Sequence, residues 1–263
     1  MADPIITLTT DFGEASPYVA AMKGVILSIN PQIQLVDISH DVPPQDIIEA
    51  AWLLRTAYRY FPAGTVHLVV VDPGVGSNRR AIAVRAFDSY FVAPDNGVLF
   101  WALRDASIDA VELTNRDYFR SEVSATFHGR DVFAPVAAHL AAGMPLEALG
   151  RAVLDPVRLD IPEPLVTPGQ IRAHVAHIDR FGNLITSIDV SLLDAFAPDR
   201  RALAIQIAGH RITGIATTYS DASPGELLAL IESTGLLEIA AREASAAALL
   251  QARRGAEVLI EKR

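Results

Sequence analysis

Apolar and β-branched runs alternate with segments of helical spacing in the first half of the chain. Short continuous apolar runs predict strands, and the run at 66–71 is typical of a strand that is buried on both faces of its sheet. Apolar residues that recur every three or four positions predict helices. The predicted strands are 5–9, 33–38, 66–71, 81–84 and 90–93, and the predicted helices are 18–29, 46–60 and 131–142.

This alternation favours an α/β domain with a mainly parallel sheet that is covered on both faces. The pattern changes near residue 155, where prolines become frequent and helical spacing disappears. Strand-like runs dominate afterwards, at 172–178, 203–208, 227–231, 236–240 and 258–261, with one Ala-rich helix predicted at 242–253. We therefore predict an α/β domain over 1–155, a Pro-rich linker over 156–169 and a smaller, mostly antiparallel β domain over 170–263.

Charge and composition limit the classes of binding partner and the kinds of site that the protein can have. The net charge of −9 argues against a nucleic acid or an anionic membrane surface, but a small cation remains possible. The chain has no cysteine, which excludes disulfides, thiolate metal sites and thiol nucleophiles. Its first ten residues hold an acidic Asp3 and no basic segment, and no apolar run approaches membrane-spanning length. A soluble cytoplasmic protein is expected.

Three polar loops follow predicted strands or precede a helix in the first half, at 9–13, 72–76 and 127–131. Ligands of open α/β sheets bind at the carboxyl ends of strands. Asp11 could accept both hydroxyls of a ribose, or it could simply cap a turn. Arg79 follows Asp72 by seven residues, so the loop can fold back and pair the two side chains. An exposed salt bridge of little consequence is the alternative for this pair.

The remaining candidates are weaker when each is taken alone. His128 precedes a glycine at the start of a helix that Asp131 is expected to cap, so it could be a site residue or a neighbour of the cap. The segment 179–183 places an acid, an aromatic ring and an amide at a turn, which suits an adenine ring or an ordinary β-turn. No metal-ligand cluster, phosphate-binding loop, dinucleotide fingerprint or serine-hydrolase elbow occurs. No metal is therefore expected.

Six motifs in one order change this picture. They are T-T-D-F-G, V-D-P-G-V-G-S-N-R-R, A-P-D-N-G, T-F-H-G-R-D-V-F, D-R-F-G-N-L-I-T and Y-S-D-A-S-P-G-E. Together they resemble the S-adenosyl-methionine hydrolases (adenosine-forming), relatives of the fluorinases and chlorinases, over about residues 5–262. The resemblance implies an N-terminal α/β domain, a C-terminal β-barrel-like domain and a homotrimer with substrate between subunits. It also implies S-adenosyl-methionine as substrate, adenosine and methionine as products, and no cofactor.

The same resemblance implies a role for individual residues. The catalytic set would be Asp72, Arg79 and His128. Halogenating relatives carry a tyrosine where this chain has Asp72, and a carboxylate there attracts water and repels halide. Hydrolysis is therefore expected, with halogenation and a non-catalytic S-adenosyl-methionine or adenosine sensor as the alternatives. The implied substrate contacts are Asp11 and Gln45 for the nucleoside, Phe181, Asn183 and Tyr219 for adenine, and Asp179, Ser233, Glu238 and Ala241 around the methionine end and its surroundings.

Overall fold

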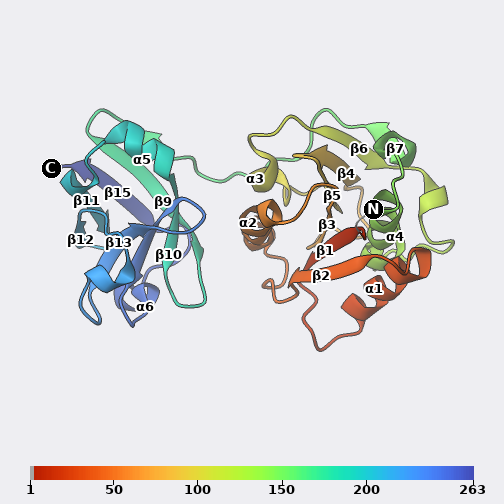
Figure 1. Ribbon diagram of the computed structural model, residues 1–263, viewed down its shortest axis with the longest axis horizontal. Helices are drawn as coiled ribbons and strands as arrows, with labels where there is room; N and C mark the ends of the chain where they lie inside the picture. The colour runs from red at the N-terminus through yellow and green to blue at the C-terminus, as the bar shows by residue number, and fades with distance from the viewer. Residues whose placement is uncertain (1–2) are drawn as a thin grey trace. The chain divides into compact units, whose positions relative to one another are not determined.

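The computed structural model describes residues 3–263, which form two compact units (Figure 1). The division between the units falls between Leu159 and Asp160. Each unit has its own apolar core, and each is described separately below.

The first unit is built on a seven-stranded mixed sheet with the order β2-β1-β3-β5-β4-β6-β7. The ladders among β2, β1, β3 and β5 are parallel, and the ladders from β5 through β4 and β6 to β7 are antiparallel. The strands are β1 (Ile5–Thr10), β2 (Gln34–Ser39), β3 (Val66–Val70), β4 (Ala81–Ala86), β5 (Ser89–Pro94), β6 (Asp109–Leu113) and β7 (Gly150–Ala152).

The predicted parallel sheet is thus confirmed only in part. β4 and β5 are joined by the two residues Phe87 and Asp88, which have φ values of 49° and 58°. Two left-handed residues in a two-residue loop make a tight hairpin, and a hairpin pairs its strands antiparallel. The antiparallel half of the sheet continues from this hairpin.

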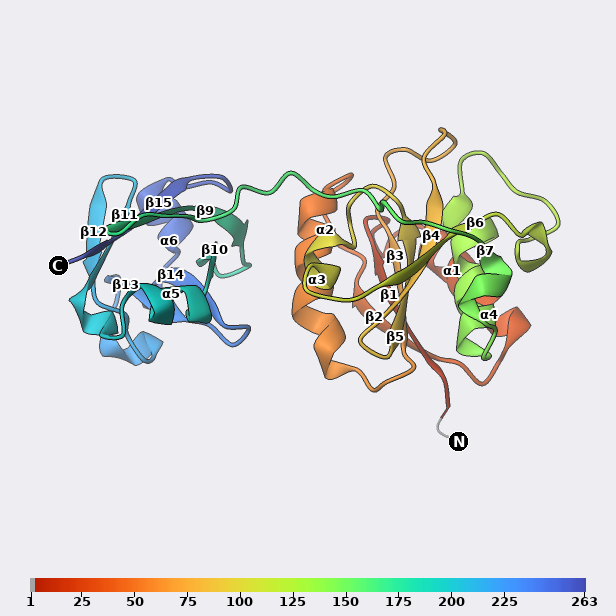
Figure 2. The same ribbon diagram turned by 90° about the horizontal axis from the view of Figure 1, so that it is seen from above.

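Helices cover both faces of this sheet, as predicted (Figure 2). Side chains of β3 alternate between the faces: Val66, Leu68 and Val70 join the core under α1 and α4, whereas Val69 joins the core under α2 and α3. The helices are α1 (Tyr18–Ile29), α2 (Ile47–Ala57), α3 (Phe100–Leu103) and α4 (Ala134–Ala141), with short 3-10 turns at Tyr58–Tyr60, Arg116–Tyr118 and Leu146–Leu149.

The helix predicted at 131–142 begins differently from expectation. Gly129–Phe133 forms a π-helical turn that leads into α4, and Asp131 is buried within it rather than capping it. Pro135 has no N–H to donate to the Asp131 carbonyl four residues earlier, and the Arg120 N–H donates to that carbonyl instead at 3.0 Å. The turn is wider than an α-helix because the Ala134 N–H donates to the Gly129 carbonyl, five residues earlier.

The second unit is an antiparallel β structure with the strand order β12-β11-β15-β9-β10-β14-β13. Every ladder along this order is antiparallel. Ala216, after β12, forms a bridge to Leu230 of β13, which brings the two ends of the order together into a nearly closed barrel. The strands are β8 (Leu165–Val166), β9 (Gln170–Ile178), β10 (Leu184–Asp189), β11 (Leu203–Ile207), β12 (His210–Thr213), β13 (Leu227–Ile231), β14 (Leu236–Ala241) and β15 (Glu257–Lys262).

The helices of this unit are short: α5 (Val190–Phe196), α6 (Ala246–Leu250) and 3-10 turns at Arg200–Ala202 and Tyr219–Asp221. The predicted helix at 242–253 is wrong at both ends. β14 runs to Ala241, and Glu243 has a φ of 55° in the turn that follows, so the helix begins only after Ser245 caps it. The predicted linker, 156–169, includes β8, which pairs with β9. Within residues 3–263, every helix is too short or too polar to cross a bilayer.

Candidate functional site

The loop after β3 folds back on itself and pairs Asp72 with Arg79. Backbone bonds from Val75 to the Asp72 carbonyl and from Ser77 to the Gly74 carbonyl tighten the loop. Arg79 Nε donates to Asp72 Oδ1 at 2.8 Å, and Arg79 Nη2 donates to Asp72 Oδ2. The Asp72 side chain is 7% exposed and that of Arg79 is 12% exposed. The contact is therefore a two-pronged, shielded ion pair with fixed geometry, unlike an exposed surface pair.

His128 joins this pair from the start of the π-helical turn. Arg79 Nη2 lies 2.9 Å from His128 Nδ1. A guanidinium can only donate, so Nδ1 accepts and the ring proton of the neutral imidazole lies on Nε2. Burial and the Arg79 charge lower the pKa of His128, while Asp72 and Asp131 act in the opposite direction. The ring is therefore held neutral in a defined tautomer.

A cavity of about 360 Å³ opens beside these groups. Asp72 and His128 line the cavity. Arg79 contacts both side chains but does not itself line the cavity. Asp11, directly after β1, also lines it and accepts a hydrogen bond from the Gln45 backbone N–H at 2.8 Å. Gln45 has a φ of 66°, a left-handed conformation that is uncommon for a residue other than glycine. The cavity thus carries two carboxylates, an imidazole and an amide side chain.

Three aromatic rings that the sequence analysis did not select also line this cavity. Phe12, Tyr18 and Phe127 form a cluster with ring centroids 5.1 to 5.9 Å apart. Phe12 and Phe127 are the immediate sequence neighbours of Asp11 and His128, and this adjacency was the signal that could have indicated them. The three rings give the cavity apolar surface in addition to its charged groups, as in many small-molecule sites.

A second cavity, of about 600 Å³, lies in the second unit. Asp179 organises it: its Oδ1 accepts the backbone N–H of Phe181 at 2.9 Å and of Asn183 at 2.8 Å, and its Oδ2 accepts Asn183 Nδ2 at 3.0 Å. Phe181 is exposed, as is Tyr219, and both rings line the cavity together with Ala241. Two exposed rings beside an amide form a surface that suits a flat heteroaromatic group.

Glu238 holds the hydroxyl of Tyr219, one of the two rings that line this cavity. The Tyr219 hydroxyl donates to Glu238 Oε1 at 2.9 Å, and Glu238 is buried. Burial raises the pKa of Glu238 to about 7, and the Asp179 and Glu232 charges act in the same direction. Ser233 is exposed in the turn between β13 and β14, where its Oγ lies 3.4 Å from Glu232 Oε2. Neither Ser233 nor Glu238 is among the described residues that line the cavity.

Acidic and imidazole groups do not gather into a metal-binding cluster anywhere in the described part of the chain, residues 3–263. The residues that line the two cavities supply hydrogen-bonding groups, charges and aromatic surfaces. The first cavity has a carboxylate and a neutral imidazole held by one arginine, and the second has paired rings and an amide.

Both units of the chain are similar in sequence to known proteins. Residues 6–150 match the SAM hydroxide adenosyltransferase N-terminal domain, and residues 173–259 match the C-terminal domain of the same family. An (R)-S-adenosyl-L-methionine hydrolase of Salinispora tropica is 45% identical, with 94% of each chain covered. An (R)-S-adenosyl-L-methionine hydrolase of Thermus thermophilus is 38% identical, with 95% of this chain and 96% of the Thermus protein covered.

Two further similarities define the range of these relatives. A fluorinase of an Actinoplanes species is 31% identical over 99% of this chain and 98% of its own. The crystal structure of an uncharacterized conserved protein from Thermotoga maritima superposes with a TM-score of 0.91 at 39% identity, covering 98% of this chain and 100% of that one. Both reaction types, hydrolysis and halogenation, therefore occur among proteins similar to this chain over nearly its full length.

Proposed function

Because the chain belongs to the SAM hydroxide adenosyltransferase family, we propose that it hydrolyses S-adenosyl-L-methionine to adenosine and L-methionine. Relatives that are 38 to 45% identical carry the name of that hydrolase. The observation that carries the proposal is the cluster in which Arg79 holds both Asp72 and His128 beside the first cavity. A carboxylate at this position suits an attacking water, whereas it would repel a halide ion.

In the proposed reaction, the oxygen of water attacks C5′ of the ribose while the C5′–S bond breaks. The electron pair of that bond goes to sulfur and yields the neutral thioether of methionine. The sulfonium is already a good leaving group, so the main task is to hold water in line with the breaking bond. Orientation of this kind supplies several kcal/mol of barrier reduction.

Proton transfer falls to Asp72 in this arrangement. His128 Nδ1 already accepts from Arg79, so the neutral ring has no free acceptor nitrogen and can only donate through Nε2–H. Asp72 retains lone pairs beyond those used by Arg79, and these can accept a hydrogen bond and then the proton from water. Of the two water protons, one stays on the new 5′-hydroxyl and the other passes through Asp72 to solvent.

Substrate binding is proposed to use both cavities. Asp11 would accept the ribose hydroxyls with Gln45 beside it, while Phe181, Asn183 and Tyr219 would hold adenine. The exposed rings of Phe181 and Tyr219, and the cavity that both share with Asn183, support the adenine assignment. Asp179, Ser233, Glu238 and the Ala241 backbone are assigned to the methionine end and its surroundings.

Assembly and location extend the proposal. We propose a homotrimer with active sites at subunit interfaces, which is what the resemblance to this family implies. Light scattering coupled to size-exclusion chromatography tests it, because a monomer that turns over substrate at full rate would contradict it. A cytoplasmic location stays a prediction from the sequence.

The reaction is tested by incubating the protein with S-adenosyl-methionine in oxygen-18 water. The label should appear in the 5′-hydroxyl of adenosine, and mass spectrometry of both products measures it. Label in methionine would contradict attack at C5′. Formation of 5′-chloroadenosine in chloride would show a halogenase, and binding without turnover would show a sensor. Asp72→Asn should lower the rate at which labelled adenosine forms about 100-fold or more, whereas Arg151→Gln, whose partner Glu112 does not line the cavity, should leave it unchanged.

A further inference from the structure

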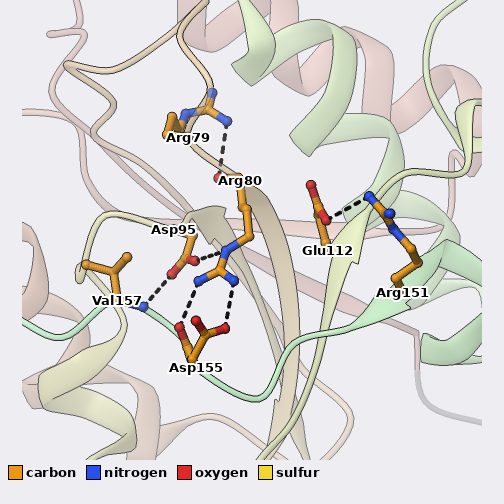
Figure 3. Close-up of polar contacts among 7 residues, drawn as sticks. All are labelled: Arg79, Arg80, Asp95, Glu112, Arg151, Asp155 and Val157. Atoms are coloured by element: carbon orange, nitrogen blue, oxygen red, sulfur yellow. Dashed lines mark hydrogen bonds and ion pairs between the residues drawn. The ribbon is translucent and has the colours of Figure 1, made fainter.

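A second network of ionic contacts begins at Arg80, the residue next to Arg79 (Figure 3). Arg80 Nε donates to Asp95 Oδ2 at 2.7 Å, and its two other nitrogens donate to Asp155 Oδ1 at 2.8 Å and to the Asp155 carbonyl at 2.7 Å. The Asp95 side chain is only 2% exposed. Its other oxygen, Oδ1, accepts the Val157 backbone N–H at 2.8 Å. A buried carboxylate is thus satisfied on both oxygens.

This network reaches the Arg79 guanidinium through one carbonyl group. The Asp95 N–H donates to the Arg80 carbonyl at 2.9 Å, and Arg79 Nη1 donates to the same carbonyl at 3.4 Å. The other side of the loop is held by the adjacent residue, because Asn96 Nδ2 donates to the Val71 carbonyl at 2.9 Å. The turn at 95–96 therefore fastens the chain just before Asp72 and just after Arg79.

We propose that Asp95 and Arg80 form a positioning pair that fixes the Arg79 guanidinium between Asp72 and His128. The proposal rests on the proposed hydrolase function. The Arg79 guanidinium donates hydrogen bonds to three groups at once: the Asp72 carboxylate, the His128 imidazole and the Arg80 carbonyl. A guanidinium that must serve all three needs its backbone held still, since displacement by about 1 Å can cost a large part of the rate.

Two variants remove this support while leaving every group that lines the cavity in place. Asp95→Asn keeps an oxygen for the Val157 N–H but presents an NH2 group to Arg80 Nε, so two donors face each other. Arg80→Lys keeps the positive charge but cannot donate in three directions from a planar fork. Arg151→Gln is the matched control, because it breaks the exposed pair with Glu112, also drawn in Figure 3.

The expected kinetic result separates turnover from binding. Asp95→Asn and Arg80→Lys should lower kcat about tenfold while KM changes by less than about threefold, because the affected group assists the reaction and not substrate binding. Arg151→Gln should match the wild type in both constants. Rates are compared per folded protein, well below each variant's melting temperature, so that a loss of stability does not count as a loss of turnover.

A second readout needs no turnover. The charged groups that act on His128 are Arg79, Asp72 and Asp131. Arg79 lowers the pKa of His128, so a displaced Arg79 should let that pKa rise in Asp95→Asn and Arg80→Lys and leave it unchanged in Arg151→Gln. Titration of the His128 ring signals by NMR measures this shift.

Each outcome decides between the ideas. Wild-type protein that forms no adenosine overturns the proposed function, while the NMR titration still tests the positioning pair. Active wild type together with variants that melt earlier but keep kcat and the His128 pKa overturns the positioning pair and leaves a purely structural clamp. If Asp95→Asn does not fold, Arg80→Lys decides by the same two readouts.

Discussion

Glu238 is a buried carboxyl group whose ionisation should make the stability of the second unit depend on pH. The side chain is 3% exposed, and its one hydrogen bond described above comes from Tyr219. Burial is the largest cause that raises its pKa from 4.5 to about 7, and the Asp179 and Glu232 carboxylates add to the effect. The Tyr219 hydrogen bond opposes it but is the weaker influence.

The sign and size of the effect follow from this shift. Because the folded-state pKa is above the unfolded-state pKa, folding is penalised once the group must ionise. The penalty is small below pH 4.5, grows between pH 4.5 and 7, and is complete above pH 7. One pKa unit corresponds to about 1.4 kcal/mol, so the full penalty is about 3 kcal/mol.

Glu238→Gln removes the charge and keeps an oxygen that can accept the Tyr219 hydroxyl. The variant should therefore gain free energy of unfolding relative to the wild type, by about 2 to 3 kcal/mol more at pH 8.5 than at pH 5. Urea unfolding without substrate at the two pH values measures it. Glu243→Gln is the control, because that side chain is 66% exposed beside the same cavity and should show no such pH dependence. A Glu238→Gln advantage that is equal at both pH values would refute the reasoning.

Three other predictions concern single positions. Asp72→Asn should lower kcat about 100-fold or more in a steady-state adenosine assay, because the carboxylate that accepts the water proton is gone. Asp11→Ala should raise KM about tenfold with a smaller effect on kcat in the same assay; a change confined to kcat would contradict its assignment to the ribose. Gly182→Ala should lower the melting temperature strongly, since φ is 82° and a Cβ would lie 2.0 Å from Ser245 Oγ, whereas Gly255→Ala, with φ of 85° and open space, should cost only about 1 kcal/mol.

Elements with strong local patterns were predictable from the sequence. The helix predicted at 18–29 and the strand predicted at 227–231 have the predicted bounds, the first from its helical spacing and the second from an unbroken apolar run. The β4–β5 hairpin was not predictable in direction. Phe87 and Asp88 lack the Asn-Gly or Asp-Gly signal of a tight hairpin, yet the pairing of the flanking strands forces both into the left-handed region.

The π-helical turn shows a similar limit at the site itself. Pro135 could have been recognised as a residue that leaves the Asp131 carbonyl free, but the donor that takes this carbonyl, Arg120, comes from a separate loop. Long-range pairing of this kind has no local signal. The turn matters for the site because His128 directly precedes it, so the backbone of the turn determines the position of the His128 side chain.

The adjacent residues Arg79 and Arg80 differ in how far their partners could be predicted from the sequence. They immediately precede β4, and consecutive residues that enter a strand project to opposite sides, so Arg79 and Arg80 had to serve different partners. The spacing of seven positions from Asp72 made it a predictable partner for Arg79. The partner of the second, Asp95, lies 15 residues away, and Asp155 lies 75 residues away. Spacing alone cannot identify partners so far along the chain, so the pairing of Arg80 with Asp95 is seen only in the folded protein. The R-R dipeptide at the start of a strand indicates only that the two side chains point in different directions.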